Sequence, residues 1–122
     1  MPPRDDSSTT LPLRTNWFHI LLCLADGEQH GYAIMQEVRE RTGGKVKLWP
    51  ATLYGTLRRL MDEGLIEESG DRPAEDVDDQ RRRYYRLSRD GRRALTAEIA
   101  RLEELVRAAR AKRRALHGES RS

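Results

Sequence analysis

The feature that most constrains this chain is a regular apolar pattern close to its C-terminus. Apolar side chains recur there at alternating steps of four and three residues, namely at Leu95, Ile99, Leu102, Val106 and Ala109. This spacing forms the heptad seam along which two helices stay in contact. A helix over residues 89–116 would be longer than a small domain is wide. The seam could pack on its own domain, but its length favours pairing with a second copy of the chain.

The composition fits one domain with an appended element. With 122 residues, 35% of them charged and 37% hydrophobic, the chain is polar for a monomer, which also favours an oligomer. Cys23 is the only cysteine, so no internal disulfide can form, and its apolar neighbours predict a small buried hydrophobe rather than a reactive thiol. There is no signal-peptide pattern and no stretch apolar enough for a membrane span, so we expect a soluble cytoplasmic protein without a membrane partner.

The local patterns predict four helices and one β-hairpin. Apolar positions at helical spacing, with glycine or proline near the ends, place helices over residues 14–25, 31–41, 50–63 and 89–116. Short strand candidates lie at 65–69 and 82–87, with a further stub at Val46, and the polar segment between the two strands is expected to be a long hairpin tip. Residues 1–12 and 117–122 are predicted to be disordered tails.

The order helix, helix, helix, hairpin, long helix predicts a mainly α fold with a small β-hairpin, the winged helix-turn-helix. This domain would occupy residues 13–88, and residues 89–116 would form a C-terminal dimerisation helix. In such modules the third helix enters the major groove of DNA, and the hairpin, or wing, lies near the backbone or the minor groove. Double-stranded DNA is therefore the first partner to consider.

The third predicted helix has two unlike faces. Its apolar side holds a stripe at the spacing of a buried face, made of Leu53, Leu57, Leu60 and Met61. The other side is small, hydroxylated or cationic, with Ala51, Thr52, Gly55, Arg58 and Arg59. Short side chains permit close approach and cations meet phosphates or guanine edges, so we expect Thr52, Gly55 and Arg59 to face bases and Arg58 to face a phosphate. For an isolated helix, a solvated surface would be the simpler interpretation.

Three segments resemble the signature blocks of PadR-type transcriptional regulators. They are HGYAIMQEV (30–38), PATLYGTLRRLMDEGLIEE (50–68) and RRRYYRLSRDGRRAL (81–95), in the family's order and with ordinary spacing. The resemblance covers about residues 16–105. It implies a homodimeric winged-helix repressor that binds a palindromic operator and releases it when a small molecule docks. The C-terminal segment is similar to the subclass with a single C-terminal helix.

The resemblance also implies DNA contacts by named residues. In the family the Tyr of HGY, the TLY helix and the basic strand after the wing meet DNA, which corresponds here to Tyr32, Thr52, Tyr54, Arg81, Arg82 and Arg83. Tyr32 at the start of its helix could bind a phosphate, or could be a core residue with its hydroxyl at the rim. Tyr54 projects to the flank of its helix, where either role is open. The three arginines could instead pair with Asp76, Asp78 and Asp79 across the hairpin. These acids would then shield the arginines until DNA competes for them.

Two features depart from the family pattern. Trp49 stands where the family usually has a small or polar residue before the helix proline, so the usual capping hydroxyl is missing; we expect its ring to pack or cap the helix start rather than stack on a ligand. Residues 67–79 hold seven acids and one arginine, a charge of −6, whereas residues 81–93 hold seven arginines and one aspartate, a charge of +6. Phosphates repel acids, so we expect the wing tip to stay off the DNA.

Trp17 and Phe18 are candidates for an effector pocket. In the family the first helix packs against the partner's C-terminal helix and can help line an effector cavity, which implies a small aromatic effector near these two residues. Most aromatic side chains on such a helix are simply core residues. Both interpretations stay open from the sequence.

No pattern predicts catalysis, a cofactor or a metal site. His19, His30 and His117 lie far apart, no pair has the spacing of metal ligands, and no glycine-rich loop follows a strand; His30 more simply shapes the turn before the second helix. The sequence therefore favours a sequence-specific DNA-binding regulator acting as a homodimer. Two alternatives remain: a winged-helix module that binds protein through its acidic wing, and a drug sensor with an aromatic-lined dimer interface.

Overall fold

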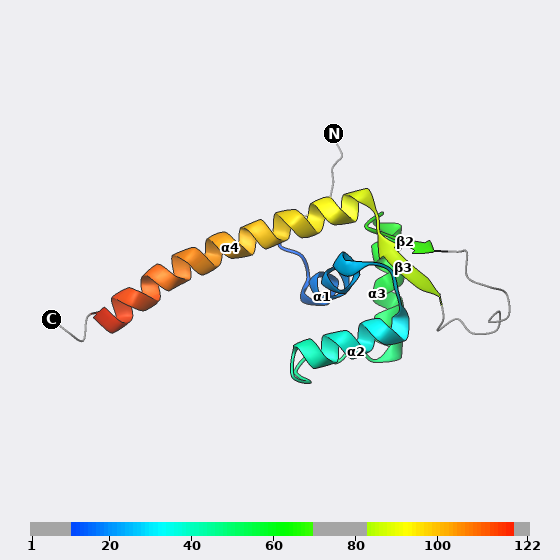
Figure 1. Ribbon diagram of the computed structural model, residues 1–122, viewed down its shortest axis with the longest axis horizontal. Coiled ribbons are helices and arrows are strands. Elements are labelled where there is room, and N and C mark those ends of the chain that lie inside the picture. The colour runs from blue at the N-terminus through cyan, green and yellow to red at the C-terminus, as the bar shows by residue number, and fades with distance from the viewer. Residues whose placement is uncertain (1–10, 70–82, 119–122) are drawn as a thin grey trace.

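Three short helices pack against a small sheet, and a fourth helix leaves them as a long arm (Figure 1). The computed structural model describes residues 11–69 and 83–118. In chain order the elements are α1 (Thr15–Cys23), a 3-10 turn η1 (Leu24–Asp26), β1 (Gln29–His30), α2 (Gly31–Arg41), α3 (Pro50–Asp62), β2 (Ile66–Ser69), β3 (Tyr84–Leu87) and α4 (Arg89–Gly118). This is the predicted mainly helical winged helix-turn-helix with an appended helix.

The sheet is antiparallel and has the strand order β1-β3-β2. The β2–β3 pair forms the predicted hairpin, in a register that sets Ile66 opposite Leu87 and Ser69 opposite Tyr84. Strand β1 pairs with the edge of β3 that faces away from β2. This strand was not predicted, because two residues are too few to show an alternating pattern. The predicted stub at Val46 is wrong: this residue lies in a loop, where its N–H donates to the Thr42 hydroxyl over 3.0 Å.

Most helix boundaries follow the local signals. Helix α2 has the predicted bounds, and α3 ends one residue before the predicted 63. Gly64, at φ +78°, closes α3 in a left-handed conformation, and the following Leu65 N–H donates to the Leu60 carbonyl over 2.9 Å. Helix α1 is shorter than predicted because its last turn tightens into η1. Helix α4 continues through Gly118, two residues past its predicted end.

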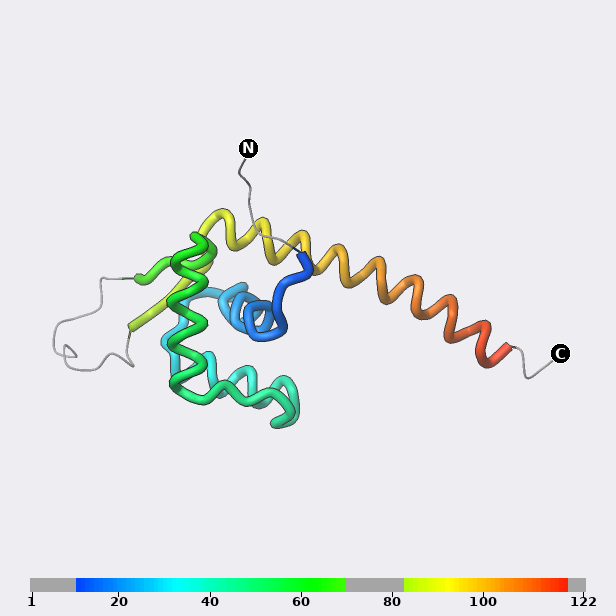
Figure 2. Tube along the Cα trace, turned by 180° about the vertical axis from the view of Figure 1, so that it is seen from behind, coloured from blue at the N-terminus to red at the C-terminus, as the bar shows by residue number. Residues whose placement is uncertain are grey.

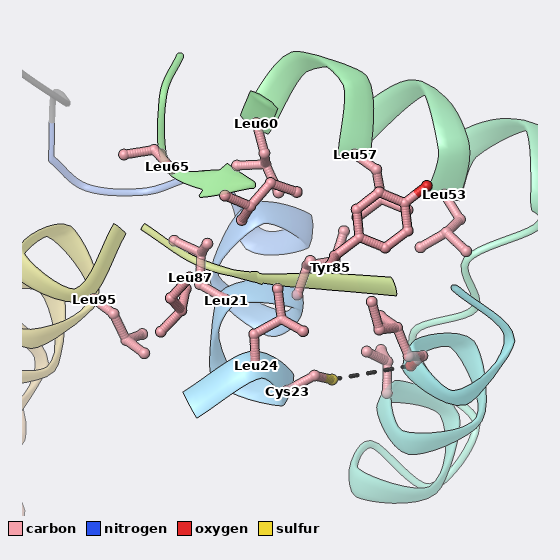
Figure 3. Close-up of a cluster of buried hydrophobic side chains, with 14 of the residues drawn as sticks. Leu21, Cys23, Leu24, Leu53, Leu57, Leu60, Leu65, Tyr85, Leu87 and Leu95 are labelled. Atoms are coloured by element: carbon pink, nitrogen blue, oxygen red, sulfur yellow. Dashed lines mark hydrogen bonds between the residues drawn. The ribbon is translucent and has the colours of Figure 1, made fainter. Parts of the chain in front are cut away.

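The core lies where α1, α3 and the sheet meet (Figure 3). Leu21, Leu24, Leu57, Leu60 and Leu87 are all buried and belong to one cluster, to which α1, η1, α3 and β3 contribute. Burying such a side chain contributes about 1.5–3 kcal/mol each. Cys23 is buried in the same cluster, with its sulfur 3.9 Å from the Ile34 carbonyl oxygen, and burial raises the pKa of its thiol to about 11. The expectation of a small buried hydrophobe at this position is confirmed.

The joint between α3 and α4 fixes the direction in which α4 leaves the domain. The Ser88 hydroxyl caps the start of α4 by accepting the Gly91 N–H over 2.9 Å, and it donates to the Gly64 carbonyl over 2.5 Å. The first turn of α4 passes so close to the turn after α3 that a Cβ on Gly91 would lie 1.9 Å from the Leu65 carbonyl oxygen. Only glycine fits there without a backbone shift, so the joint is tightly packed.

Helix α4 changes character along its length. Leu95 is 5% exposed and belongs to the domain's own core, which corrects its predicted place in an intermolecular seam. Ile99 is 36% exposed and Val106 46% exposed, and the remaining turns extend beyond the domain (Figure 2). The seam that could meet another molecule therefore begins at Ile99. Among residues 11–69 and 83–118, none of the helices is both long and apolar enough to cross a membrane.

Candidate nucleic-acid interface

Helix α3 buries one face and presents the other to solvent. Its buried side chains are Leu53, Thr56, Leu57 and Leu60. The five residues predicted from the sequence to form the other face are all exposed, namely Ala51, Thr52, Gly55, Arg58 and Arg59, and so are Pro50 and Asp62 at the two ends of the helix. Nothing lies within 4 Å of the position that a Cβ on Gly55 would take, so the middle of this face is open and smooth. Such a surface can approach a flat, anionic partner closely.

The two arginines of α3 lie on opposite flanks of Gly55. Arg59 borders a shallow depression of about 270 Å³ together with Arg14, Asn16 and Trp17 at the start of α1. Arg58 lies toward β3, where its charge acts on Tyr85; burial raises the pKa of the Tyr85 hydroxyl, and Arg58 acts against that rise. Positive charge therefore borders the small central surface on both sides.

Tyr32 and Tyr54 have different environments. Tyr32 is exposed in the first turn of α2, where its hydroxyl accepts a hydrogen bond from the Gln36 amide over 3.3 Å, so it is not a core residue. Tyr54 turns inward, and a Cβ on Gly31 would lie 2.6 Å from its hydroxyl oxygen, which is itself buried. The phosphate contact expected of Tyr54 is therefore corrected: this side chain packs α3 onto the start of α2.

The start of α2 is capped by a histidine. The Nδ1 atom of His30 accepts the Ala33 N–H over 3.2 Å, and its ring meets Tyr84 of β3 edge to face, with ring centres 5.4 Å apart. The cap explains the expected role of His30 in shaping the turn before α2. It also links the start of α2 to the sheet.

Trp49 neither packs nor caps, contrary to expectation. Helix α3 begins at Pro50, which suits a first helical turn, and the Trp49 carbonyl accepts the Leu53 N–H over 2.8 Å. The Trp49 side chain makes no capping bond and is 65% exposed. It borders a hollow of about 190 Å³ between α2 and the loop before α3.

The base of the wing carries cross-strand ion pairs. Arg83 lies 3.1 Å from Glu68, and Arg86 lies 3.1 Å from Glu67. Both pairs are solvent-exposed, and such pairs stabilise a fold by at most about 1 kcal/mol, so Arg83 can exchange its carboxylate for a phosphate. The predicted contacts of Arg81 and Arg82, and the acidic wing tip, lie outside the described residues.

A second surface runs between α1 and α4. Phe18 of α1, the exposed Ile99 and Val106 of α4 and the half-buried Leu102 line a groove of about 690 Å³. The groove is bordered by Glu103 and three arginines, Arg107, Arg110 and Arg114. Ala109 of the predicted seam is exposed in the same helix. Trp17 lies elsewhere, with the Arg14 guanidinium 5.7 Å above its ring. The two aromatic residues expected to share an effector pocket are thus separated, and only Phe18 reaches the α1–α4 groove.

A buried carboxylate that the sequence did not single out, that of Glu98, holds α4 to the segment before α1. Glu98 accepts two hydrogen bonds from Arg101, over 2.7 and 2.8 Å, and one from the Leu13 N–H over 3.2 Å. The hydrogen bonds from Arg101 lower the pKa of Glu98, and the bond from Leu13 lowers it further. The sequence clue to its burial is spacing, since Glu98 lies three residues after the core residue Leu95 and therefore on the same side of the helix.

The family follows from comparison with known proteins. A family model described as the transcriptional regulator PadR-like family matches residues 20–97, which is more than half of the chain. The chain belongs to the PadR-like family of transcriptional regulators. This membership indicates a role in transcriptional regulation. Within the described part of the chain, no three His, Cys, Asp or Glu side chains lie together as a metal site would require.

Similar proteins include other transcriptional regulators. The transcriptional regulator Rv3488 of Mycobacterium tuberculosis is 44% identical over 89 residues, covering 73% of this chain and 77% of that protein. A PadR family transcription regulator from Clostridium difficile R20291 superposes with a TM-score of 0.63 at 25% identity, over 78% of this chain and 94% of the other. Bacillus subtilis PadR, solved in complex with operator DNA, gives a TM-score of 0.59 at 26% identity, over 72% of this chain and 47% of that one.

Proposed function

We propose that this PadR-like regulator is a homodimeric repressor that binds an inverted-repeat operator with α3 in the major groove. The observation that carries the proposal is the exposed face of α3, where Thr52 and Gly55 form a low surface between Arg58 and Arg59. Small and hydroxyl side chains admit base edges, and flanking guanidinium groups meet guanine or phosphate. The similarity to a PadR solved with operator DNA supports the same partner here.

Dimerisation is supported by the apolar surface that α4 leaves exposed. Ile99, Val106 and Leu116 continue an apolar stripe beyond the domain, and Phe18 of α1 borders the same groove. A helix from a second copy supplies the apolar partner that this stripe requires, because a seam of alternating three- and four-residue steps packs best on another helix. Two copies would then hold two α3 helices about one DNA turn, roughly 34 Å, apart.

The effector belongs to the same proposal. A small aromatic molecule that enters the α1–α4 groove beside Phe18 would meet apolar side chains together with Arg107, Arg110 and Arg114, which suits an aromatic ring bearing a negative group. Binding there would shift the two α4 helices and change the separation of the two α3 helices. Since both half-sites must be occupied at once for tight binding, a small change in separation releases the operator.

The test is a selection of bound fragments from random duplexes, followed by gel shifts at several salt concentrations. The expected consensus is an inverted repeat with half-sites one turn apart. Arg59→Ala should weaken binding to that duplex and relax its base preference, and Arg58→Ala should lower the salt slope by about 1. Lys112→Ala on the distal part of α4 should change neither affinity nor salt slope. The proposal fails if the wild type shows no sequence preference, or if Arg59→Ala binds as the wild type does. A protein-binding module would show the first result.

A further inference from the structure

Trp49 requires an explanation that the fold does not supply. It is the residue directly before α3, yet its side chain is 65% exposed and caps nothing. An indole left in water gives up the favourable free energy of burying a large aromatic surface. Tyr32, at the start of α2, is also exposed and borders the same hollow. Two large aromatic side chains therefore lie open to solvent where α2 and α3 begin.

The surroundings of the hollow favour an anionic partner. Its lining includes the cations Arg39 and Lys47, the amide of Gln36 and the apolar groups of Leu48 and Pro50, but no acidic residue. At about 190 Å³ the hollow is smaller than the roughly 300–1,000 Å³ of ordinary ligand pockets. An extended anionic surface therefore suits this patch better than an enclosed small molecule does.

We propose that Trp49, Tyr32 and Lys47 form a docking surface for operator DNA, in which the Trp49 indole reads a thymine by contact with its C5-methyl group. The inference rests on the proposed function, because it requires α3 in the major groove. Residues at the N-terminal end of a recognition helix are the ones that contact base edges. A side chain that is almost wholly apolar can match only one base-edge group there, the thymine methyl. Lys47, next to it, contacts a phosphate.

This contact makes Trp49 a specificity-determining residue that is separate from the Arg58–Arg59 pair. The apolar contact carries no charge, so its loss changes affinity without changing the salt dependence of binding. Loss of the Lys47 contact has the opposite signature, because each neutralised phosphate adds about 0.9 to the salt slope. The contributions of Trp49 and Lys47 can therefore be distinguished by one measurement, the salt dependence of binding.

The experiment uses the full-length protein and the inverted repeat recovered by selection from random duplexes. Each thymine of one half-site, with its symmetry mate, is replaced by uracil, which removes only the methyl group. At one position the wild type should bind about fourfold more weakly per methyl. Trp49→Ala should bind the thymine and uracil duplexes equally at that position, and Trp49→Phe should keep part of the difference. Because Trp49 is exposed, thermal unfolding of both variants should match the wild type.

Salt titrations of the same proteins complete the test. Lys47→Gln should lower the salt slope by about 1, and Trp49→Ala should leave it unchanged. The inference is overturned if the wild type is insensitive to every uracil substitution, or if Trp49→Ala retains the sensitivity. In both cases the wild type still binds the inverted repeat, so the proposed function stands. If the wild type binds no duplex selectively, the proposed function itself fails.

Discussion

Helices α3 and α4 are both amphipathic, but they turn opposite faces outward. In α3 the leucine stripe is buried in the chain's own core, and the small, cationic face is left to solvent. In α4 the apolar stripe is buried in the core only as far as Leu95, and its later members Ile99 and Val106 are exposed. The difference follows from position: α3 packs across the sheet and α1, whereas α4 extends beyond every other element (Figure 1). Under the proposed function, the exposed face of α3 binds DNA and the exposed stripe of α4 packs on another apolar helix.

The largest expected effect comes from placing charge on the exposed stripe of α4. The double variant Ile99→Asp, Val106→Asp should become monomeric and lose about 100- to 10,000-fold in affinity for the inverted repeat, because the two half-sites no longer bind as a unit. Its thermal unfolding should still be cooperative, since both residues lie outside the core. Ala100→Asp, Ala108→Asp puts the same charge on other exposed positions of α4 and should remain dimeric. Size-exclusion chromatography with light scattering separates these outcomes.

The next effect concerns the joint that separates the two helices. Gly91→Ala forces a Cβ against the Leu65 carbonyl, so the free energy of unfolding should fall by about 2–3 kcal/mol. Gly118→Ala, with nothing within 4 Å of its Cβ position, should be neutral. Denaturant titrations measure both. Equal stability of the two variants would show that the joint is looser than its contacts indicate.

A smaller effect comes from the buried carboxylate of α4. The pKa of Glu98 is lowered in the fold, so its ionised form stabilises the protein above the ordinary glutamate pKa of about 4.3, and this stabilisation is lost as pH falls through the lowered value. Glu98→Gln weakens the bonds to Arg101 and Leu13 and should cost about 1 kcal/mol at pH 7. As the pH falls from about 5 to about 3, the free energy of unfolding should decrease less for the variant than for the wild type. Urea denaturation at several pH values checks this, and parallel curves for the two proteins would contradict it.

The smallest expected effect on stability comes from Gly55→Ala, which should also weaken binding to the operator. This substitution adds a methyl group in open space on α3, so the free energy of unfolding should rise by about 0.5–1 kcal/mol. The same methyl group raises the surface that faces the groove, and affinity for the operator should fall. Unfolding and gel-shift measurements on one preparation test both parts. A variant that is more stable and binds equally well would show that this face does not approach DNA closely.

Local signals in the sequence predicted the elements but not all of the long-range contacts. Helix α2 was bounded by glycines and α3 by Pro50 and Gly64, so their limits were readable from the chain alone. Strand β1 was missed because it depends on pairing with β3, more than 50 residues later. The exposed face of α3 was predicted as a set, because one buried stripe determines the opposite side of a helix.

Residues at the borders of the two faces were the ones placed incorrectly. Tyr54 lies at the flank of α3, where the helical pattern is compatible with either a buried or an exposed side chain. Its contact with Gly31 shows that the side chain is turned inward. Leu95 shares the heptad spacing of Ile99, and only the packing of α4 on the domain separates the two. The exposure of Trp49 depends likewise on the path of the loop before α3, which local propensity does not determine.

Sedimentation equilibrium of the wild type, alone and with one inverted-repeat duplex, tests the central claim most directly. The account predicts that two chains associate without DNA and that two chains bind each duplex, with a duplex carrying a single half-site bound far more weakly. Single chains in solution that occupy each half-site independently, with equal affinity for the isolated half-site and the inverted repeat, would contradict it.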